Sequence, residues 1–213
     1  MAKPPRTLAQ IEQDVQSRDP AVRGSAVQDL VLRARKDPSL HAQVLAVFRN
    51  AVDVDDDPGV VATAARGIQD VLGPDKSRST WLALLNRPDA MIVARVALAI
   101  DDRQCVPALL DLLRRRPELI IHQSVLYTLG RLKNPAAFDT LIEHLAIPSL
   151  RGHAIDALAE VGDPRAISHL EPLVNDNTDA RPDDRGLMLQ IGDLASGAIR
   201  QLQHARAAGN SEA

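Results

Sequence analysis

Aromatic residues are scarce in this chain of 213 residues. They make up 2% of it and are Phe48, Trp81, Tyr127 and Phe138. The core must therefore be aliphatic, built from leucine, isoleucine, valine and alanine, a composition that suits closely packed helices. The scarcity also leaves little to stack on a large conjugated pigment or on nucleic-acid bases.

Cysteine and long apolar runs are also lacking. The single cysteine, Cys105, excludes an intramolecular disulfide and any zinc site built from several cysteines. No apolar run approaches the ~18 residues that a membrane span needs. The first fifteen residues lack the apolar stretch of a signal peptide. We therefore expect a cytoplasmic protein.

Basic charge is not in excess either. The net charge is −3, which argues against a broad affinity for nucleic acid, because such binding usually needs a strongly basic face. Hydrophobic residues make up 45% of the chain and charged residues 25%. These proportions are those of a folded chain with a continuous core and an ordinary charged surface.

An internal repeat is the strongest signal that is present. Apolar residues that would close the first helix of each unit recur at steps of 28, 32, 29 and 30 residues: Leu72, Ile100, Leu132, Val161 and Ile191. Nine residues after the first four come Trp81, Leu109, Leu141 and Leu170. A period near 30 that holds at several positions predicts stacked structural repeats.

Each unit has the pattern of two helices joined by a tight turn. Between Pro148 and Val161 the apolar residues recur three and four positions apart and form one face. Gly162 is placed to end this helix, and Asp163 is placed to cap the next one, with Pro164 at its first position.

The turn sequence Gly-Asp-Pro-Arg-Ala-Ile at 162–167 and the Asp-Pro-Ala-Val-Arg start at 19–23 resemble the short HEAT-like repeats of phycobilin lyases. The resemblance covers roughly residues 19–205. It implies an all-α, armadillo-like fold, an α–α superhelix (a HEAT-like solenoid) of antiparallel helix pairs without a sheet. The motif residues are structural, so the resemblance says less about function. Tetratricopeptide and ankyrin repeats fit worse, because their periods are ~34 and ~33 and their signatures are absent.

Three segments follow from this pattern. Residues 1–18 are expected to be an N-terminal arm and capping helix, with a capping box between Thr7 and Gln10. Residues 19–206 are the repeats, closed by one longer helix over about 187–202. Residues 207–213 are expected to be a disordered tail.

Two charged motifs suggest chemistry but have simpler structural explanations. Asp53, Asp55 and Asp57 are spaced like the first ligands of a calcium loop, but the required glycine and the final glutamate of that loop are missing. An acidic loop whose last aspartate caps a helix is the preferred interpretation. The run at 114–116 is three arginines at a predicted helix end, where cations complement the helix dipole.

The histidines are the least expected residues in the repeat. His144 stands where other units have a leucine, and His169 lies near it in the next second helix, so that the two could face each other beside Glu143. A metal needs three or four ligands, and only two are plausible here. The alternative is a partly buried histidine bonded to a carbonyl and an exposed one.

No catalytic, cofactor or metal site is predicted, and no small-molecule ligand. The resemblance implies that second helices line a concave face, which solenoids use to bind other proteins. We therefore predict a non-catalytic protein-binding scaffold or adaptor whose partner contacts Asp111, Arg114, Asp139, Glu143, His144 and His169. A lyase-like enzyme or accessory factor of the short-HEAT family is the first alternative, and a DNA-binding HEAT-like protein is the second.

Overall fold

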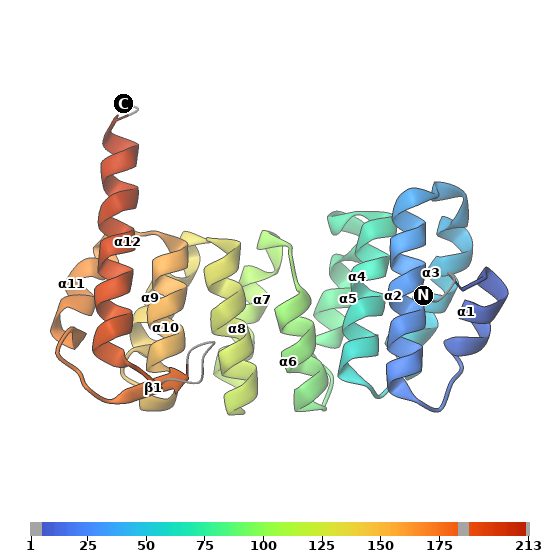
Figure 1. Cartoon of the computed structure of the whole chain (residues 1–213), viewed down its shortest axis with the longest axis horizontal. Coiled ribbons are helices and arrows are strands. Elements are labelled where there is room, and N and C mark those ends of the chain that lie inside the picture. Colours follow the sequence, from blue (N-terminus) through green and yellow to red (C-terminus); the bar gives the residue numbers. More distant parts are fainter. Residues whose placement is uncertain (1–5, 183–187, 212–213) are drawn as a thin grey trace, which may run out of the picture. The chain divides into compact units, whose positions relative to one another are not determined.

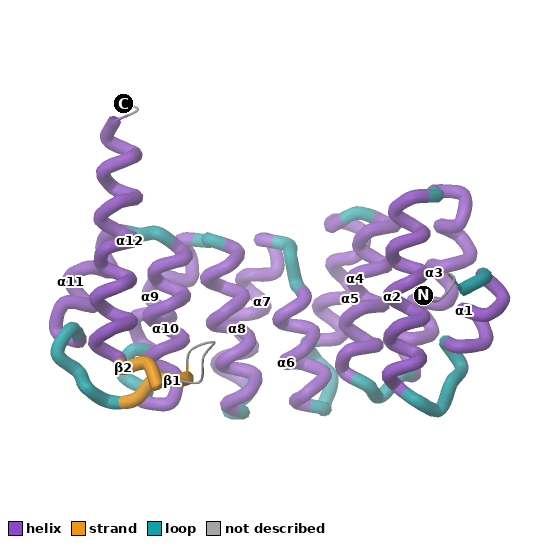
Figure 2. The backbone as a smooth tube through the Cα atoms, viewed as in Figure 1, coloured by secondary structure: helices purple, strands orange, loops and turns teal. Residues whose placement is uncertain are grey.

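Helices form most of the chain in the computed structural model, which describes residues 6–182 and 188–211 (Figure 1, Figure 2). Twelve α-helices lie within these residues. The chain separates into two compact units, Met1–Cys105 (unit 1) and Val106–Ala213 (unit 2). Within each unit, successive helices pack against each other, so the predicted all-α fold of helix pairs is confirmed.

Unit 1 has two layers of helices. They are α1 (Leu8–Asp14), α2 (Pro20–Lys36), α3 (His41–Val54), α4 (Pro58–Leu72), α5 (Pro74–Leu84) and α6 (Ala90–Ala99), with the 3-10 turns η1 (Pro38–Leu40) and η2 (Arg103–Cys105). The first helices of the repeats, α2, α4 and α6, pack side by side, and the second helices α3 and α5 pack on α4.

Unit 2 is built in the same way. Its helices are α7 (Val106–Arg115), α8 (Leu119–Leu132), α9 (Phe138–His144), α10 (Pro148–Val161), α11 (Ile167–Leu170) and α12 (Ile191–Ser211). The 3-10 turns η3 (Pro135–Ala137), η4 (Pro164–Ala166) and η5 (Glu171–Leu173) precede or follow the short helices. Helix α10 packs between α8 and α12, while α7 packs on α8 and α9 packs on α10.

The helix starts follow the capping residues that the sequence indicates. The Asp19 carboxylate accepts a hydrogen bond from the N–H of Ala21, and that of Asp57 accepts from Gly59 and Val60. A proline occupies the first turn in both helices. Each aspartate thus satisfies N–H groups that have no partner within the helix.

The N-terminal helix α1 begins with the predicted capping box. The Thr7 hydroxyl accepts from the Gln10 N–H at 3.2 Å, and the Gln10 side chain accepts from the Thr7 N–H at 2.8 Å. Ile11 is fully buried, and α1 packs on α2. The helix ends at Asp14, within the predicted segment 1–18.

Two helices of unit 2 end in the left-handed backbone region. Gly162 closes α10 at φ 81°, and Lys133 closes α8 at φ 49°. Glycine is favoured at such a position because it has no Cβ atom to clash with the backbone. Asp163 then caps η4 by accepting from the N–H of Arg165, as the sequence predicts.

The core is aliphatic, as the composition requires. In unit 2 the fully buried side chains include Ile121, Val125, Leu129, Leu141 and Leu158. Two of the chain's few aromatic side chains, Phe48 and Trp81, are fully buried in unit 1. Tyr127 behaves differently and is 59% exposed.

The expectation of a fold without any sheet is wrong at one place. Strands β1 (Asp179–Pro182) and β2 (Met188–Gln190) form a two-stranded antiparallel ladder before α12. It lies outside the stacked pairs and depends on two short segments meeting. Neither segment has a long alternating pattern that would reveal it from the sequence.

The last helix is longer than predicted and begins later. Helix α12 runs from Ile191 to Ser211 and so includes residues 207–211, which were expected to belong to a disordered tail. Residues 212–213 lie outside the described residues. In the described part of the chain, no helix combines the length and apolar character needed to cross a membrane.

Candidate functional site

Five of the six predicted contact residues lie exposed on the second helices of unit 2, two on α7, two on α9 and one on α11. We call this set the second-helix face: Asp111, Arg114, Asp139, Glu143 and His169. Helix α9 shows why they are exposed, because it turns Phe138, Leu141 and His144 inward. Asp139 and Glu143, four residues apart, are left side by side on its outer surface.

The arginine triplet at the end of α7 is divided among different partners. Arg115 forms an ion pair with Asp111 at 2.6 Å, and both side chains are about half exposed. Arg116 pairs with Glu118 at 2.6 Å, and this hydrogen bond lowers the pKa of Glu118. Arg114 and Arg115 lie in the last turn of α7, where they complement the helix dipole.

His144 does not belong to the second-helix face. It is 7% exposed, and its Nδ1 lies 2.7 Å from the carbonyl oxygen of Thr140. Its Nε2 lies 3.3 Å from Nδ1 of His122, not beside His169. Both ring nitrogens of His144 thus have partners other than His169, and its burial and its carbonyl contact are those of the alternative interpretation.

The His122–His144 pair connects the start of α8 to the end of α9. The His122 Nε2 lies 2.7 Å from the carbonyl oxygen of Arg116. A carbonyl oxygen can only accept, so the outer nitrogen of each ring is the donor. The inner nitrogens form a hydrogen bond only when one of them also carries a proton. Sequence reasoning missed His122 because it lies 22 positions before His144.

His169 instead adjoins an aromatic contact between α9 and the turn before α11. Its ring centroid lies 6.2 Å from that of Phe138 in an edge-on arrangement. The guanidinium of Arg165 stacks over the same Phe138 ring at 4.2 Å, a cation–π contact. Asp163 holds Arg165 in place at 2.6 Å, and this hydrogen bond lowers the pKa of Asp163.

The acidic motif at 53–57 is used by the fold of unit 1. Asp57 caps α4, and Asp55 forms an ion pair with Arg23 at 2.8 Å. Asp53 is exposed on α3. Within residues 6–182 and 188–211, no three histidine, cysteine, aspartate or glutamate side chains are arranged to hold a metal ion.

Cys105 is a buried core residue of unit 1. Burial raises the pKa of its thiol to about 11, and the nearby carboxylate of Asp102 acts in the same direction. A thiol of this kind is a poor nucleophile at neutral pH, because the thiolate is the reactive form.

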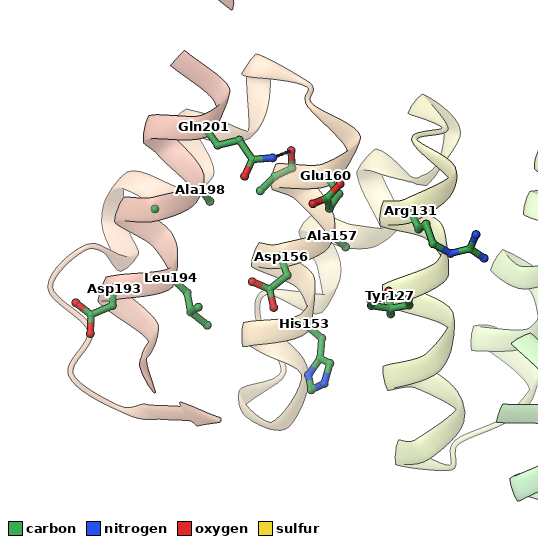
Figure 3. Close-up of a pocket in the computed structure, with 12 residues that line it drawn as sticks. Tyr127, Arg131, His153, Asp156, Ala157, Glu160, Asp193, Leu194, Ala198 and Gln201 are labelled. Carbon is green, nitrogen blue, oxygen red and sulfur yellow. Dashed lines mark hydrogen bonds between the residues drawn. The ribbon is translucent and has the colours of Figure 1, made fainter. Parts of the chain in front are cut away.

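A groove of about 760 Å³ lies along the first helices of unit 2, on the face formed by α8, α10 and α12 (Figure 3). Sequence reasoning missed it entirely. We call it the first-helix groove, and its lining residues are Tyr127, Arg131, His153, Asp156, Ala157, Ala159, Glu160, Asp193, Leu194, Gly197, Ala198 and Gln201.

Small residues form the floor of the first-helix groove. Ala157 on α10 and Ala198 on α12 are almost fully buried, and Gly197 adds no side chain. Helices α8 and α10 approach closely because position 130 is glycine. A Cβ atom at Gly130 would lie 2.8 Å from the Cα of Ala157.

Charged and aromatic groups form the sides of the groove. Three carboxylates, one guanidinium and one imidazole line it, so negative charge is in excess. Figure 3 shows Asp156 projecting from α10 toward α12, while the guanidinium of Arg131 points away from α10. Tyr127 comes from α8, and its 59% exposure is unusual for so large a side chain.

Comparison with known proteins agrees with this architecture. Residues 106–183 match the family model described as HEAT repeats. This match confirms the resemblance to HEAT-like repeats that the sequence indicates. No curated protein matches the chain.

Several solved structures are similar to the whole chain. YibA of Escherichia coli has a TM-score of 0.60 at 16% identity, over 92% of this chain and 67% of YibA. An engineered protein has a TM-score of 0.48 at 18% identity, over 93% and 99% of the two chains. The complex of CpcE and CpcF of phycocyanin lyase from a Nostoc species has 0.41 at 17% identity, over 99% and 70%. Likeness at these identities concerns the fold alone.

Proposed function

We propose that this chain is a non-catalytic protein-binding scaffold that docks a partner on the second-helix face of unit 2. One observation supports this most directly. Asp139 and Glu143 are exposed side by side on α9, while the opposite side of that helix supplies the packing. Charges that the fold does not need are free to steer association with a complementary protein surface.

The neighbouring residues add a mixed chemical character. Asp111 is half exposed and only loosely held, because an exposed ion pair within a helix contributes about 0.3–0.5 kcal/mol. His169 adds an exposed imidazole above the Phe138–Arg165 contact. Such a surface suits a partner with basic groups around a smaller apolar contact. The cytoplasm remains its predicted location.

The test is a charge reversal with a matched control. The test variant carries Asp111→Lys, Asp139→Lys and Glu143→Lys. The control carries Glu12→Lys, Asp53→Lys and Asp75→Lys in unit 1. Each set reverses three exposed carboxylates, and each includes one aspartate that pairs with an arginine three or four residues on: Asp111 with Arg115 and Asp75 with Arg78.

Both variants are compared with the wild type in affinity purification from the native host, followed by association-rate measurements on the partner recovered. We expect the control to retain the partner and the test variant to lose it. We also expect the wild-type association rate to fall as salt rises. Normal partner binding by the test variant, with folded-state circular dichroism retained, would refute the assignment of this face.

The two alternative functions make different predictions for the same protein. A lyase-like role requires a bound small molecule, which would be detected as a change in melting temperature with a pigment present. DNA binding requires affinity that falls steeply with salt.

A further inference from the structure

The first-helix groove has the dimensions and chemistry of a site for a protein segment. Its volume of about 760 Å³ lies within the range of ~300–1,000 Å³ typical of ligand sites. We propose that it binds a segment of a partner protein that inserts arginine or lysine side chains beside Glu160 and Asp193. This inference rests on the proposed function, but it concerns a different face of unit 2.

The floor allows a backbone to come close. Ala157, Gly197 and Ala198 present at most a methyl group each. A hydrogen bond of 3.0 Å from the Gln201 side chain to the carbonyl oxygen of Ala159 fixes α12 against α10. The floor is therefore held by two helices in contact and is preformed before a ligand arrives.

The charge of the lining determines which ligand fits. Asp156, Glu160 and Asp193 together outnumber the one guanidinium, that of Arg131. Glu160 is 3.8 Å from Lys133, but both side chains are more than half exposed, so this contact is weak. A ligand cation can therefore compete with Lys133 for Glu160. An acidic segment would instead meet like charge.

Tyr127 supplies the second recognition element. It is the chain's only tyrosine, and its ring stays 59% exposed at the α8 side of the groove. Arginine and lysine are attracted to the face of an aromatic ring, and tyrosine is over-represented where proteins bind one another. An arginine-bearing segment can contact this ring and the carboxylates together.

A defined peptide pair tests the proposal on the full chain. The probe is an alanine-rich helical peptide with three arginines one turn apart, and its matched control has glutamate in place of each arginine. Two-dimensional ¹H–¹⁵N spectra follow the backbone amides. We expect the arginine peptide to shift Tyr127, Ala157, Gly197 and Ala198. We expect the glutamate peptide to shift none of them.

Four variants locate the binding energy. Glu160→Gln with Asp193→Asn should weaken the arginine peptide about five-fold at low salt, the effect expected for losing two exposed charge contacts. Asp53→Asn with Asp75→Asn, two exposed carboxylates of unit 1 outside both faces, should leave its affinity unchanged. Tyr127→Ala should also weaken binding, while Tyr127→Phe should retain most of it.

Four results would overturn the proposal. Three of them are equal binding of the two peptides, shifts confined to residues outside the groove, and equal weakening by the groove variant and the unit 1 variant. A self-association that Glu160→Gln with Asp193→Asn abolishes would likewise overturn it, because the occupant would then be a second copy. None of these depends on the charge reversal of the second-helix face, so the two proposals can fail separately.

Discussion

The contact between Gly130 on α8 and Ala157 on α10 allows a quantitative prediction. A Cβ atom at position 130 would lie 2.8 Å from the Ala157 Cα, 3.2 Å from its Cβ and 3.3 Å from its carbonyl oxygen. Two of these three atoms are backbone and cannot rotate away. Gly130→Ala must therefore separate two packed helices, and overpacking of this kind costs about 1–3 kcal/mol.

The substitution also has a favourable effect, since alanine in a helix interior is better than glycine by about 0.5–1 kcal/mol. We therefore expect a net loss of about 1–2 kcal/mol in the free energy of unfolding. Gly197→Ala is the matched control, because a Cβ there would meet only the Arg200 guanidinium at 4.0 Å. That variant should gain about 0.5–1 kcal/mol.

Urea unfolding of the full chain, followed by circular dichroism at the helical band, measures both effects. The slope of the free energy of unfolding against urea concentration should be the same for all variants. A shift in the midpoint then reports a change in stability. Adding Ala157→Gly to Gly130→Ala should restore little, because it removes only the contact at 3.2 Å. A Gly130→Ala protein as stable as Gly197→Ala would refute the close approach of α8 and α10.

Two further predictions concern polar contacts of unit 2. His144→Leu should change the free energy of unfolding by less than about 1 kcal/mol, because a lost hydrogen bond worth ~0.5–1.5 kcal/mol is offset by burial of an alkyl side chain. A loss above about 3 kcal/mol in urea unfolding would show that the pair with His122 is a required network. Arg165 lowers the pKa of Asp163, so this carboxylate stabilises the fold fully above its ordinary pKa of ~3.9, and the effect is lost as pH falls through the lowered value. Asp163→Asn should therefore show a shallower loss of stability between about pH 4 and pH 2 than the wild type, and parallel curves for the two proteins would contradict this ion pair.

The sequence alone was enough to predict the helices and their pairing. Asp57 followed by Pro58 fixes a helix start through local hydrogen bonds, and Gly162 fixes an end through its backbone freedom. These signals act within a few residues of one another. The apolar period of about 30 residues then requires that each pair bury its face on the next.

The exposed acidic residues were also within reach of the sequence. Asp139 and Glu143 stand where the repeat needs no apolar side chain, and the structure leaves both exposed. What the sequence could not predict was their surroundings. The stacking of Arg165 on Phe138 depends on the path of the chain between α9 and α11.

Contacts between helices far apart in the chain required the tertiary structure. His144 meets His122 because the two helices of a pair run antiparallel, which brings the start of α8 to the end of α9. Residue spacing gives the face of one helix but not the offset between two helices, so the spacing indicated His169 and not His122.

The first-helix groove likewise arises only from packing. Asp156 lies 29 residues after Tyr127, and Asp193 lies 37 residues after Asp156, so no local motif joins them. They line one groove because Gly130 lets α8 approach α10 and because α12 packs on the other side of α10. Local sequence thus determined where each helix begins and ends, whereas side-chain volume between helices decided which surface is hollow and which charges line it.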